Sequence, residues 1–423
     1  MIIGGGIGGL LAAHAAAGRF ERVTVLERDR YPSDADSPAP PTRRGTPQGR
    51  CLHLLLAAGA AAFDELVPDW RNELEALGAT AFDASADAAL RLSNGWLPRS
   101  RSGIGTYACS RSLLETMLRR ALAGRPNVRL REGRKVVGLL GDRSGGRVTG
   151  VRVARERDPG ETKMHADLVV DTSGAGSKLS RWIASLLDSG TARAERTVVD
   201  SGHQYASRWF HLEPGDEPDW HCLAVAPAAD TGFRSAMMLR AERGRWGVVL
   251  LTTAGDPLPS NDAAFLRFVA ALANGELGKT LGRARPVSPI HRYRPTANRM
   301  MHYDRLEAWP AGLVALGDAV CVFDPYFGLG MTVAARGAVL LANHLANHLD
   351  REGGRASSSL QFQKDLAALN AQPWRLVTGR DRRDSAELGR VHAMAPSSAQ
   401  AAHALLAVQH LLRPAETLKE LAP

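Results

Sequence analysis

The chain has 423 residues, of which 53 are Lys or Arg and 44 are Asp or Glu, giving a formal net charge of +9. This length allows two or three domains at about 100–200 residues each, and 44% hydrophobic with 23% charged residues excludes a chain that is disordered throughout. The positive residues are mostly Arg interspersed with acids, so the composition favours a solvated surface over a nucleic-acid partner.

The N-terminus carries a glycine-rich motif. Three apolar residues, Met1 to Ile3, precede Gly4-Gly5-Gly6-Ile7-Gly8-Gly9, and a helix-forming stretch follows. Glycines 4, 6 and 9 form GxGxxG, in which the first permits a tight turn, the second lets backbone approach a pyrophosphate and the third lets helix and strand pack closely. The strand is about half the usual length, so either the start has been trimmed or the sheet begins abruptly.

A second strand, residues 22–28, ends in an acid. Glu27 follows Gly9 by 18 residues, where its carboxylate can accept hydrogen bonds from ribose hydroxyls. The phosphates of a dinucleotide would rest on the helix N-terminus. A glycine-rich turn without a ligand is the alternative. The cofactor contacts expected here are Gly4, Gly6, Ile7, Gly8, Gly9, Glu27 and Arg28.

The sequence pattern of residues 200–290 is typical of a β-sheet. Segments 207–212, 222–225, 235–240 and 246–251 read as strands, and a glycine turn joins the last two. The pattern predicts an antiparallel sheet inserted into the nucleotide-binding fold.

A second cofactor motif follows. A buried strand ends in Gly317-Asp318, and residues 325–331 lead into a long apolar helix from Thr332 to Leu349. Two glycines before a helix present backbone N–H groups and a positive dipole end, which suits the pyrimidine edge of a flavin, while Asp318 can bind the ribityl hydroxyls. The expected contacts are Asp318, Pro325, Gly328, Leu329, Gly330 and Met331.

With these motifs the sequence resembles the FAD-dependent aromatic hydroxylase and epoxidase superfamily, typified by p-hydroxybenzoate hydroxylase and squalene epoxidase. The resemblance runs through most of residues 1–350. Residues 44–53, Arg-Gly-Thr-Pro-Gln-Gly-Arg-Cys-Leu-His, look like the branch of bacterial flavin epoxidases acting on polyketides, where Arg-x-Gly-x-Pro-Gln-Gly-Arg-x-x-His follows the second strand.

The resemblance implies further cofactor contacts. Arg111, at a helix start, would reach the FAD phosphate or ribityl region, the alternative being a surface arginine. The strand of Val136 would pass the adenine. Arg44, Gln48 and Arg50 are expected on the cofactor as well.

The implied fold is α/β: a Rossmann-like FAD-binding fold of the glutathione reductase type, with an inserted antiparallel β-sheet substrate domain and a helical C-terminal tail. We expect residues 1–75, 105–185 and 290–350 to form the FAD-binding domain and residues 76–104 and 186–289 the substrate domain. Residues 351–423 show apolar residues at helical spacing and form the tail.

One segment departs from the family pattern. The family carries a strand ending in Asp-Gly that serves both FAD and NAD(P)H binding, whereas here the expected Asp falls on Ser173, two residues after Asp171. Either NADPH binds differently, or electrons come from a partner flavin reductase.

The resemblance implies an FAD-dependent monooxygenase that uses O2, through a flavin hydroperoxide, to hydroxylate or epoxidise a bulky, largely apolar small molecule in bacterial specialised metabolism. Candidate catalytic groups are His53, Asp324 and Tyr326. The alternatives are that His53 only hydrogen-bonds backbone and that Asp324 only caps its loop.

Competing functions share parts of this pattern. Flavin halogenases carry a Trp-x-Trp-x-Ile-Pro motif and an essential lysine in the first third of the chain, and this sequence has neither, since its first lysine is Lys135. An FAD-dependent double-bond reductase of the geranylgeranyl reductase kind and a non-catalytic FAD-binding protein stay open.

The remaining features bear on metals and location. Four scattered cysteines without a CxxC pair exclude a disulfide framework and a zinc site, and no metal is expected. A run of about 18 apolar residues and a signal-peptide pattern are both missing from the sequence. We therefore expect a cytoplasmic protein without a membrane span.

Overall fold

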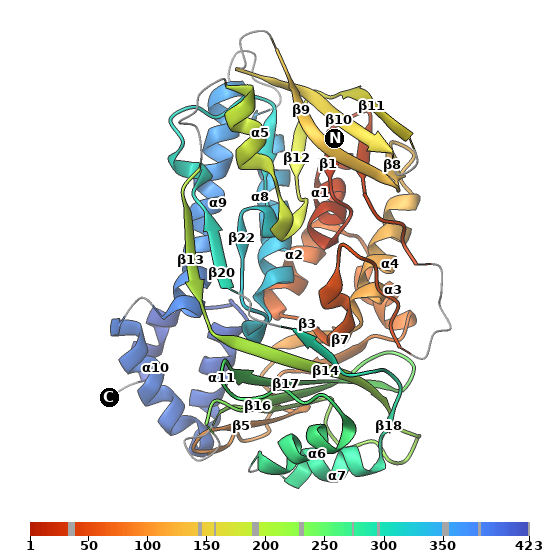
Figure 1. Cartoon of the computed structure of the whole chain (residues 1–423). Helices are drawn as coiled ribbons and strands as arrows, with labels where there is room; N and C mark the ends of the chain where they lie inside the picture. Colours follow the sequence, from red (N-terminus) through yellow and green to blue (C-terminus); the bar gives the residue numbers. More distant parts are fainter. Residues whose placement is uncertain are drawn as a thin grey trace.

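The molecule is built around two main sheets, a parallel sheet and a larger, mostly antiparallel sheet (Figure 1). The computed structural model describes residues 1–32, 39–142, 146–155, 158–187, 194–227, 232–272, 275–293, 297–348, 355–379 and 382–421.

The parallel sheet brings the cofactor motifs to one edge. Its strand order is β21 (Leu313–Ala315), β12 (Val169–Asp171), β1 (Ile2–Ile3), β2 (Val23–Leu26) and β8 (Val128–Arg131), with all neighbours parallel. The carboxyl ends of parallel strands share an edge. The glycine loop, Glu27 and Gly317-Asp318 directly follow three of these strands and therefore lie at the same edge.

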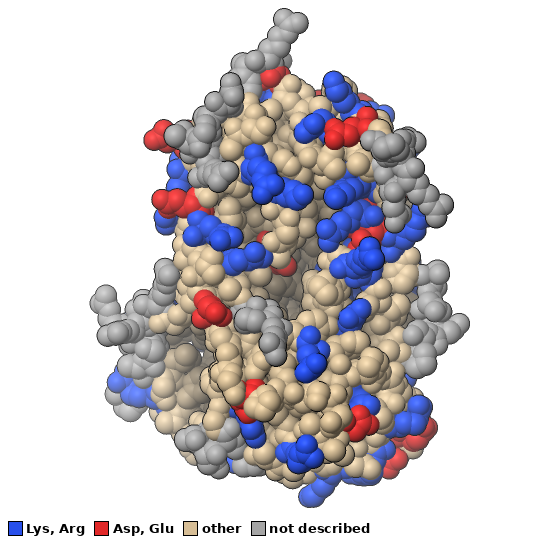
Figure 2. All heavy atoms as spheres, viewed as in Figure 1, with Lys and Arg blue, Asp and Glu red and all other residues tan. Residues whose placement is uncertain are grey.

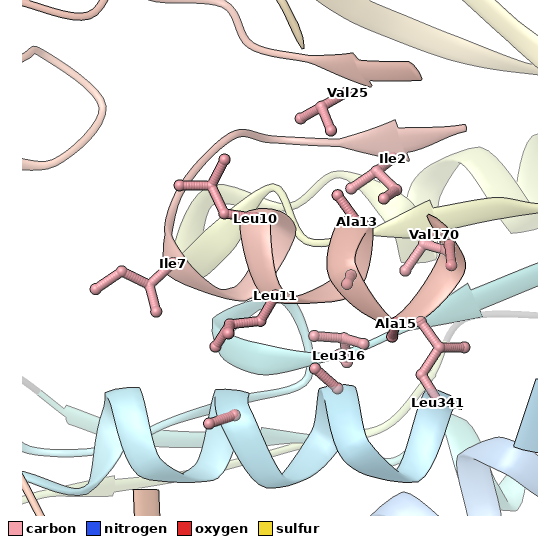
Figure 3. Packing of buried hydrophobic residues seen from close by; sticks show 14 of the residues in the cluster. Ile2, Ile7, Leu10, Leu11, Ala13, Ala15, Val25, Val170, Leu316 and Leu341 are labelled. Carbon is pink, nitrogen blue, oxygen red and sulfur yellow. The ribbon is translucent and has the colours of Figure 1, made fainter. Parts of the chain in front are cut away.

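Helix α1 (Ile7–Ala17) is apolar around its whole circumference because it is covered on both sides. Figure 3 shows it between the first strands and α8 (Leu329–His348), with Leu11, Leu316 and Leu341 in the layer between the two helices. This packing fixes the starts of α1 and α8 relative to each other.

Helix α8 bears on the expectation that the chain has no membrane span. Among the described residues, Leu329–Asn347 is long and apolar enough to cross a membrane by length and composition, with a mean hydropathy of 1.2. Buried residues make up 61% of that window, and α8 packs against α1, α2 (Ala57–Leu66) and α9 (Arg355–Thr378). This is the burial of a core helix.

The inserted sheet predicted for residues 200–290 is present. Its strand order is β18 (Arg285–Pro286), β14 (His203–His211), β17 (Arg245–Thr253), β16 (Ser235–Arg240), β15 (Cys222–Val225), β5 (Ala88–Leu92) and β6 (Gly95–Trp96), and β19 (His291–Tyr293) also pairs with β14. Neighbours are antiparallel except β15 and β5, which are parallel. Helices α6 (Asp262–Ala271) and α7 (Gly275–Arg283) share an apolar core with this sheet.

Three small sheets join these parts. They are β13 (Arg196–Asp200), β20 (Ala297–Met301) and β22 (Cys321–Val322); β3 (His53–Leu55), β7 (Gly105–Cys109) and β4 (Thr80–Asp83); and β11 (Asp158–His165), β10 (Val148–Arg155) and β9 (Arg134–Gly141). Figure 1 shows β13 and β20 running from the upper half toward the lower one. Because β4 pairs with β7, one sheet contains strands from both predicted domains, and the domain boundaries stay a prediction.

The predicted helical C-terminal region is confirmed. Helix α9 packs on α8 and β21, and α10 (Arg382–Met394) packs on α11 (Ala399–Gln409). The Asn94 side chain, between β5 and β6, donates hydrogen bonds to the carbonyl oxygens of His392 and Ala393. The remaining helices are α3 (Trp70–Ala76), α4 (Arg111–Ala123) and α5 (Leu179–Leu186).

Candidate cofactor and active site

The glycine loop turns sharply between β1 and α1. Gly4 adopts a φ of +96°, a conformation that favours glycine, and its N–H donates to the carbonyl oxygen of Leu26 at 2.8 Å. A Cβ on Gly9 would collide with the carbonyl oxygen of Gly4. The first and last glycines of the motif therefore allow the helix to start directly against the strand, as the sequence predicts.

Glu27 lies buried at the end of β2, with 4% of its surface exposed. One carboxylate oxygen accepts the Gly5 N–H at 2.7 Å, and the other accepts the Asp29 N–H at 2.9 Å. The guanidinium of Arg43 lies 3.1 Å from the same carboxylate. Glu27 therefore faces the glycine loop, as a ribose-binding acid must.

Two arginines lie beside Gly6, which has no side chain. A Cβ at this position would lie 3.4 Å from Nη2 of Arg111 and 3.9 Å from Nη2 of Arg43. Both guanidiniums are held by Glu115 of α4, at 2.9 Å for Arg111 and 3.2 Å for Arg43. Free backbone N–H groups at a helix start together with two guanidiniums suit a pyrophosphate.

Arg43 was not among the residues expected from the sequence, which named Arg44. Arg44 is exposed, whereas the Arg43 side chain is 6% exposed and donates to the carbonyl oxygen of Gly5 at 3.3 Å. The spacing Arg-x-Gly-x-Pro-Gln-Gly-Arg-x-x-His could have found it, because its first arginine falls on residue 43 when its last falls on Arg50.

The other residues expected along this stretch lie in different surroundings. Arg28 is exposed beside Asp29. Gln48 is half-buried in a short 3-10 turn, Pro47–Arg50. Arg50 is exposed and lines a pocket of about 910 Å³, whose other lining residues include residues of β14 and β19. Their contact with a cofactor stays a prediction.

His53 is half-buried at the start of β3, and its Nδ1 lies 3.0 Å from the carbonyl oxygen of Cys51. Burial, with the positive charge of Arg111, lowers the pKa of His53 to about 3. The ring is therefore neutral at pH 7, with Nδ1–H donating to the carbonyl and Nε2 left as an acceptor.

Asp318 follows β21 in a 3-10 turn, Gly317–Ala319, that opens on a left-handed Gly317 with φ +64°. Burial raises the pKa of Asp318, although the charges of Arg111 and Arg299 oppose the shift. Arg111 thus acts electrostatically on both His53 and Asp318, and its guanidinium lies beside Gly6. The charge of Arg111 thus acts on groups from two other segments of the chain.

The segment before α8, residues 324–330, is here called the flavin-side loop. Asp324 caps its 3-10 turn, Pro325–Phe327, by accepting the Tyr326 N–H at 2.9 Å. Gly328 then adopts φ +66°, and a Cβ on Gly330 would lie 4.0 Å from the carboxylate of Asp318. The loop thereby brings the first turn of α8 next to Asp318.

Asp324 is fully buried. Its carboxylate also accepts hydrogen bonds from Ser201, His203 and Tyr205, the His203 Nδ1 being 3.0 Å away. Burial raises the pKa of Asp324, but the hydrogen bonds, first among them that of His203, lower it by more. The net pKa is therefore below its usual value. These contacts anchor the start of its loop, and the catalytic role considered for Asp324 stays a prediction.

Sequence reasoning missed Ser201, His203 and Tyr205. The signal available was their alternation, since residues 203 and 205 of a strand point to the same face. The His203 ring stacks on Phe233, with centroids 4.8 Å apart and planes at 17°. Tyr326 is half-buried, and its ring centroid lies 5.7 Å from that of His203. Burial, with the charge of Asp324, raises the pKa of Tyr326.

Val136 and Ser173 complete the predicted set. Val136 is buried in β9, whose first residue, Arg134, donates its N–H to the carbonyl oxygen of Glu27 at 2.8 Å. Ser173 donates its N–H to the buried Asp171 at 2.9 Å, and its hydroxyl is buried. A hydroxyl thus stands where the family carries a carboxylate.

A hollow near the middle of one face, with Lys and Arg on both sides, is visible in Figure 2. The bare glycine loop between two guanidiniums, the buried Glu27 and the glycine-flanked start of α8 together fit FAD, an elongated and anionic ligand.

Comparisons with known proteins agree with this geometry. The profile of the family described as tryptophan halogenase matches residues 71–359, and that of an NAD(P)-binding Rossmann-like domain matches residues 2–51. The chain is 33% identical over 385 residues to Protein Rv3254 of Mycobacterium tuberculosis, covering 87% of this chain and 76% of that protein.

Solved structures share the fold over nearly the whole chain. The flavin-dependent brominase Bmp2 matches with a TM-score of 0.70 at 15% identity, covering 99% of this chain and 96% of that one. PqsL, a probable FAD-dependent monooxygenase from Pseudomonas aeruginosa, matches with 0.65 at 17% identity, covering 96% and 98%. The p-nitrophenol 4-monooxygenase PnpA from Pseudomonas putida DLL-E4 matches with 0.65 at 18% identity, covering 97% of each chain.

Proposed function

This chain belongs to the tryptophan halogenase family of flavin-dependent oxidoreductases, and on that premise we propose that it is an FAD-dependent monooxygenase. In this proposal it hydroxylates or epoxidises a bulky, largely apolar small molecule in bacterial specialised metabolism. The observation that carries the proposal is Arg111, whose guanidinium lies beside Gly6 of the glycine loop and whose charge acts on both His53 and Asp318.

The residues would share the cofactor along its length. Gly6 with Arg43 and Arg111 would hold the diphosphate, Glu27 the adenosine ribose, and Asp318 the ribityl chain. The N–H groups of the flavin-side loop and of the first turn of α8 would face the pyrimidine edge of the flavin. Reduced FAD supplies the chemistry of O2 activation, and the protein orients the substrate and excludes water.

Apolar residues next to this segment support an apolar substrate. Leu52 and Leu54, the sequence neighbours of His53, are half-buried and pack against a buried apolar cluster that includes Leu239 of β16. Their partial exposure leaves apolar surface near the candidate site that a ligand could cover.

The source of electrons has two candidates. NAD(P)H could reduce the flavin directly, or a partner flavin reductase could supply reduced FAD. The hydroxyl of Ser173 in place of a carboxylate favours neither one.

Family membership bears on one comparison made from the sequence. The missing Trp-x-Trp-x-Ile-Pro motif and the missing early lysine set the chain apart from flavin halogenases, yet the halogenase family profile spans residues 71–359. Two short motifs concern few positions, whereas a family profile follows the whole fold. Their absence therefore bears on halogenation chemistry and not on family membership.

Oxygen incorporation tests the proposed reaction. The FAD-loaded protein, supplied with NADPH or with a flavin reductase and labelled O2, should consume oxygen and place one labelled atom in an apolar aromatic or polyene substrate. A reduced product without label would indicate the double-bond reductase, and a halogenated product in the presence of bromide would indicate a halogenase. A colourless protein that binds no added FAD would contradict the proposal at its first step.

Asp318 gives a residue-level test of the cofactor placement. Asp318→Ala should weaken FAD retention about tenfold or more, the loss of roughly one good hydrogen bond to a charged group, while the unfolding temperature of the apoprotein changes little. Asp219→Ala, which removes a carboxylate that is 82% exposed, is the control. Unchanged FAD affinity in Asp318→Ala would show that the ribityl contact is elsewhere.

A further inference from the structure

A buried carboxylate and an imidazole meet where β14 reaches the flavin-side loop. Asp324 is fully buried and receives four donors: the Tyr326 N–H, the His203 Nδ1 at 3.0 Å, and the hydroxyls of Ser201 and Tyr205. A carboxylate offers about four lone-pair positions. With these occupied and no surface exposed, Asp324 cannot itself contact a ligand, and any chemical role must pass through a neighbour.

The protonation of this pair follows from its contacts. Burial by itself would raise the pKa of Asp324, but its hydrogen bonds outweigh burial and lower it, so the carboxylate is ionised at neutral pH. An ionised carboxylate only accepts hydrogen bonds, which places the proton of a neutral His203 on Nδ1. Nε2 is then the atom with a free lone pair, and among the described residues no hydrogen-bond partner is seen for it.

Aromatic rings hold the imidazole in place. Phe233 stacks on His203 at 4.8 Å, and Tyr326 lies tilted at 5.7 Å from His203 and 6.4 Å from Phe233. Phe327 stands edge-on to Tyr326 at 5.1 Å. His203 is 8% exposed and Phe233 is 39% exposed, so this aromatic cluster reaches the surface of the protein. The aromatic ring of a ligand could stack against it.

The other histidine of the site is poorly suited to take up a proton. Burial and the charge of Arg111 lower the pKa of His53 to about 3, and its Nδ1 faces a neutral carbonyl. His203 instead directs its Nδ1 to a carboxylate 3.0 Å away, which fixes the orientation of the ring and leaves Nε2 as the acceptor atom. The orientation of its ring and the adjacent carboxylate therefore favour His203 over His53 as a proton acceptor.

We propose that His203, oriented by Asp324, is the proton acceptor of the candidate active site, and that the ligand carries an ionisable hydroxyl on an aromatic ring. The proposal rests on the proposed monooxygenase function, since a deprotonated hydroxyl enriches the ring in electrons for attack by an electrophilic oxygen. In the step, the ligand O–H bond breaks, its electron pair stays on oxygen, and an N–H bond forms at Nε2. The proton returns to solvent when the product leaves.

Among the described residues, the titratable groups that contact the ring or its carboxylate come from two elements. Asp324 and Tyr326 belong to the flavin-side loop, and Tyr205 belongs to β14. Asp324 is the group that stays negative and compensates the imidazolium. Replacing Asp324 with Asn would remove that charge, and the proton of neutral His203 would no longer be fixed on Nδ1.

Coloured phenols provide the test. The FAD-loaded protein is mixed with 4-nitrophenol or 4-nitro-1-naphthol, whose phenolates absorb visible light, at a pH one unit below the pKa of the free probe. The ratio of bound phenolate to bound phenol should be about tenfold higher than in free solution, which corresponds to one pKa unit. His203→Asn keeps an N–H for Asp324 but has no acceptor at Nε2, and its bound probe should ionise as in free solution.

Controls separate this role from a structural one. His211→Asn, on the same strand as His203 and beside Glu213, should keep the tenfold excess, and all variants should retain FAD by flavin absorbance. His203→Gln repeats the comparison if His203→Asn fails to fold. Equal ionisation in wild type and the His203 variants, or no probe binding by the FAD-loaded protein, overturns the proposal. Failure to bind FAD would instead overturn the proposed function.

Discussion

Gly9 and Gly18 lie in and just after the same helix, yet they have very different surroundings. Gly9 faces the backbone of Gly4 and the hydroxyl of Thr172, and a Cβ would collide with the former. Gly18, at the C-terminal end of α1, has an ordinary φ of −81°, and a Cβ added there would meet no atom within 4 Å. Only the first is required by close approach of helix and strand.

Gly9→Ala should therefore push α1 away from β1. We expect a loss of about 1–3 kcal/mol in the free energy of unfolding, typical of an overpacked site, together with weaker FAD binding. Gly18→Ala, the matched control, should be neutral or more stable by about 0.4–1 kcal/mol because it restricts the unfolded chain. Urea unfolding and FAD titration of both variants check the pair, and equal effects would contradict the close approach.

Buried histidines predict how stability depends on pH. Burial lowers the pKa of His14 to about 4, of His53 to about 3 and of His410 to about 4, from an ordinary value of 6.5. Between these values and 6.5 the unfolded chain binds more protons than the folded one, so stability is present above pH 6.5 and is lost as the pH falls below it.

Urea unfolding at pH 7 and pH 5 measures this loss. Each histidine should contribute on the order of 1–2 kcal/mol between these two values. His410→Gln, at the residue whose Nδ1 accepts the Ala57 N–H, should show a smaller pH dependence than the wild type. If the variant showed the same pH dependence of stability as the wild type, His410 would have the same pKa in the folded and unfolded states.

At the scale of elements, β14 shows how one strand serves two purposes. His203 and Tyr205 point to Asp324 and the flavin-side loop, whereas Ala206 and Phe210 lie in the core shared with α6 and α7. The side-chain period of two separates the faces. A slip of one residue in the pairing of β14 with β17 would move the His–Asp pair away from the loop.

The contact between α2 and α8 depends on one glycine. A Cβ on Gly59 would lie 2.7 Å from Oγ1 of Thr332 and 2.8 Å from Cδ1 of Leu55. Gly59→Ala should therefore separate the two helices, cost about 1–3 kcal/mol and disturb the start of α8, with weaker FAD binding. The measurement is thermal unfolding with FAD titration.

Gly278→Ala is the control for this substitution. Gly278 lies in α7, where a Cβ would have open space, with no atom within 4 Å, and alanine should stabilise that helix by up to about 1 kcal/mol. If Gly59→Ala were equally harmless, α2 and α8 would have to tolerate a wider spacing than the structure shows.

At the scale of the whole molecule, the candidate cofactor site joins the two main sheets. The glycine loop and Asp318 follow strands of the parallel sheet, while the flavin-side loop is held through Asp324 by β14 of the larger sheet. A ligand that contacts both regions should stabilise them together.

FAD binding should therefore raise the stability of the whole chain. At a free FAD concentration about 100 times Kd, the free energy of unfolding should rise by about 2.7 kcal/mol, seen as one cooperative transition at a higher temperature in calorimetry. Arg111→Gln should reduce this increase at the same FAD concentration. A shift confined to one of two separate transitions would contradict the joint stabilisation.

The sequence by itself determined the fold class, both glycine-flanked helix starts and the acids at Glu27 and Asp318. These features depend on local requirements: a left-handed turn at Gly4, close approach at Gly9, and an acid directly after a strand. The inserted sheet and the helical tail followed from periodicity, which is also local.

The tertiary structure alone decided which side chains meet. It placed the guanidinium of Arg43 beside the carbonyl oxygen of Gly5, put Glu115 between two arginines, and brought His203 to Asp324, 121 residues away in the chain. It also showed that Asp324 is enclosed by four donors. Such contacts depend on strand register and on the packing of distant elements, and a burial that shifts a pKa arises only when those elements come together.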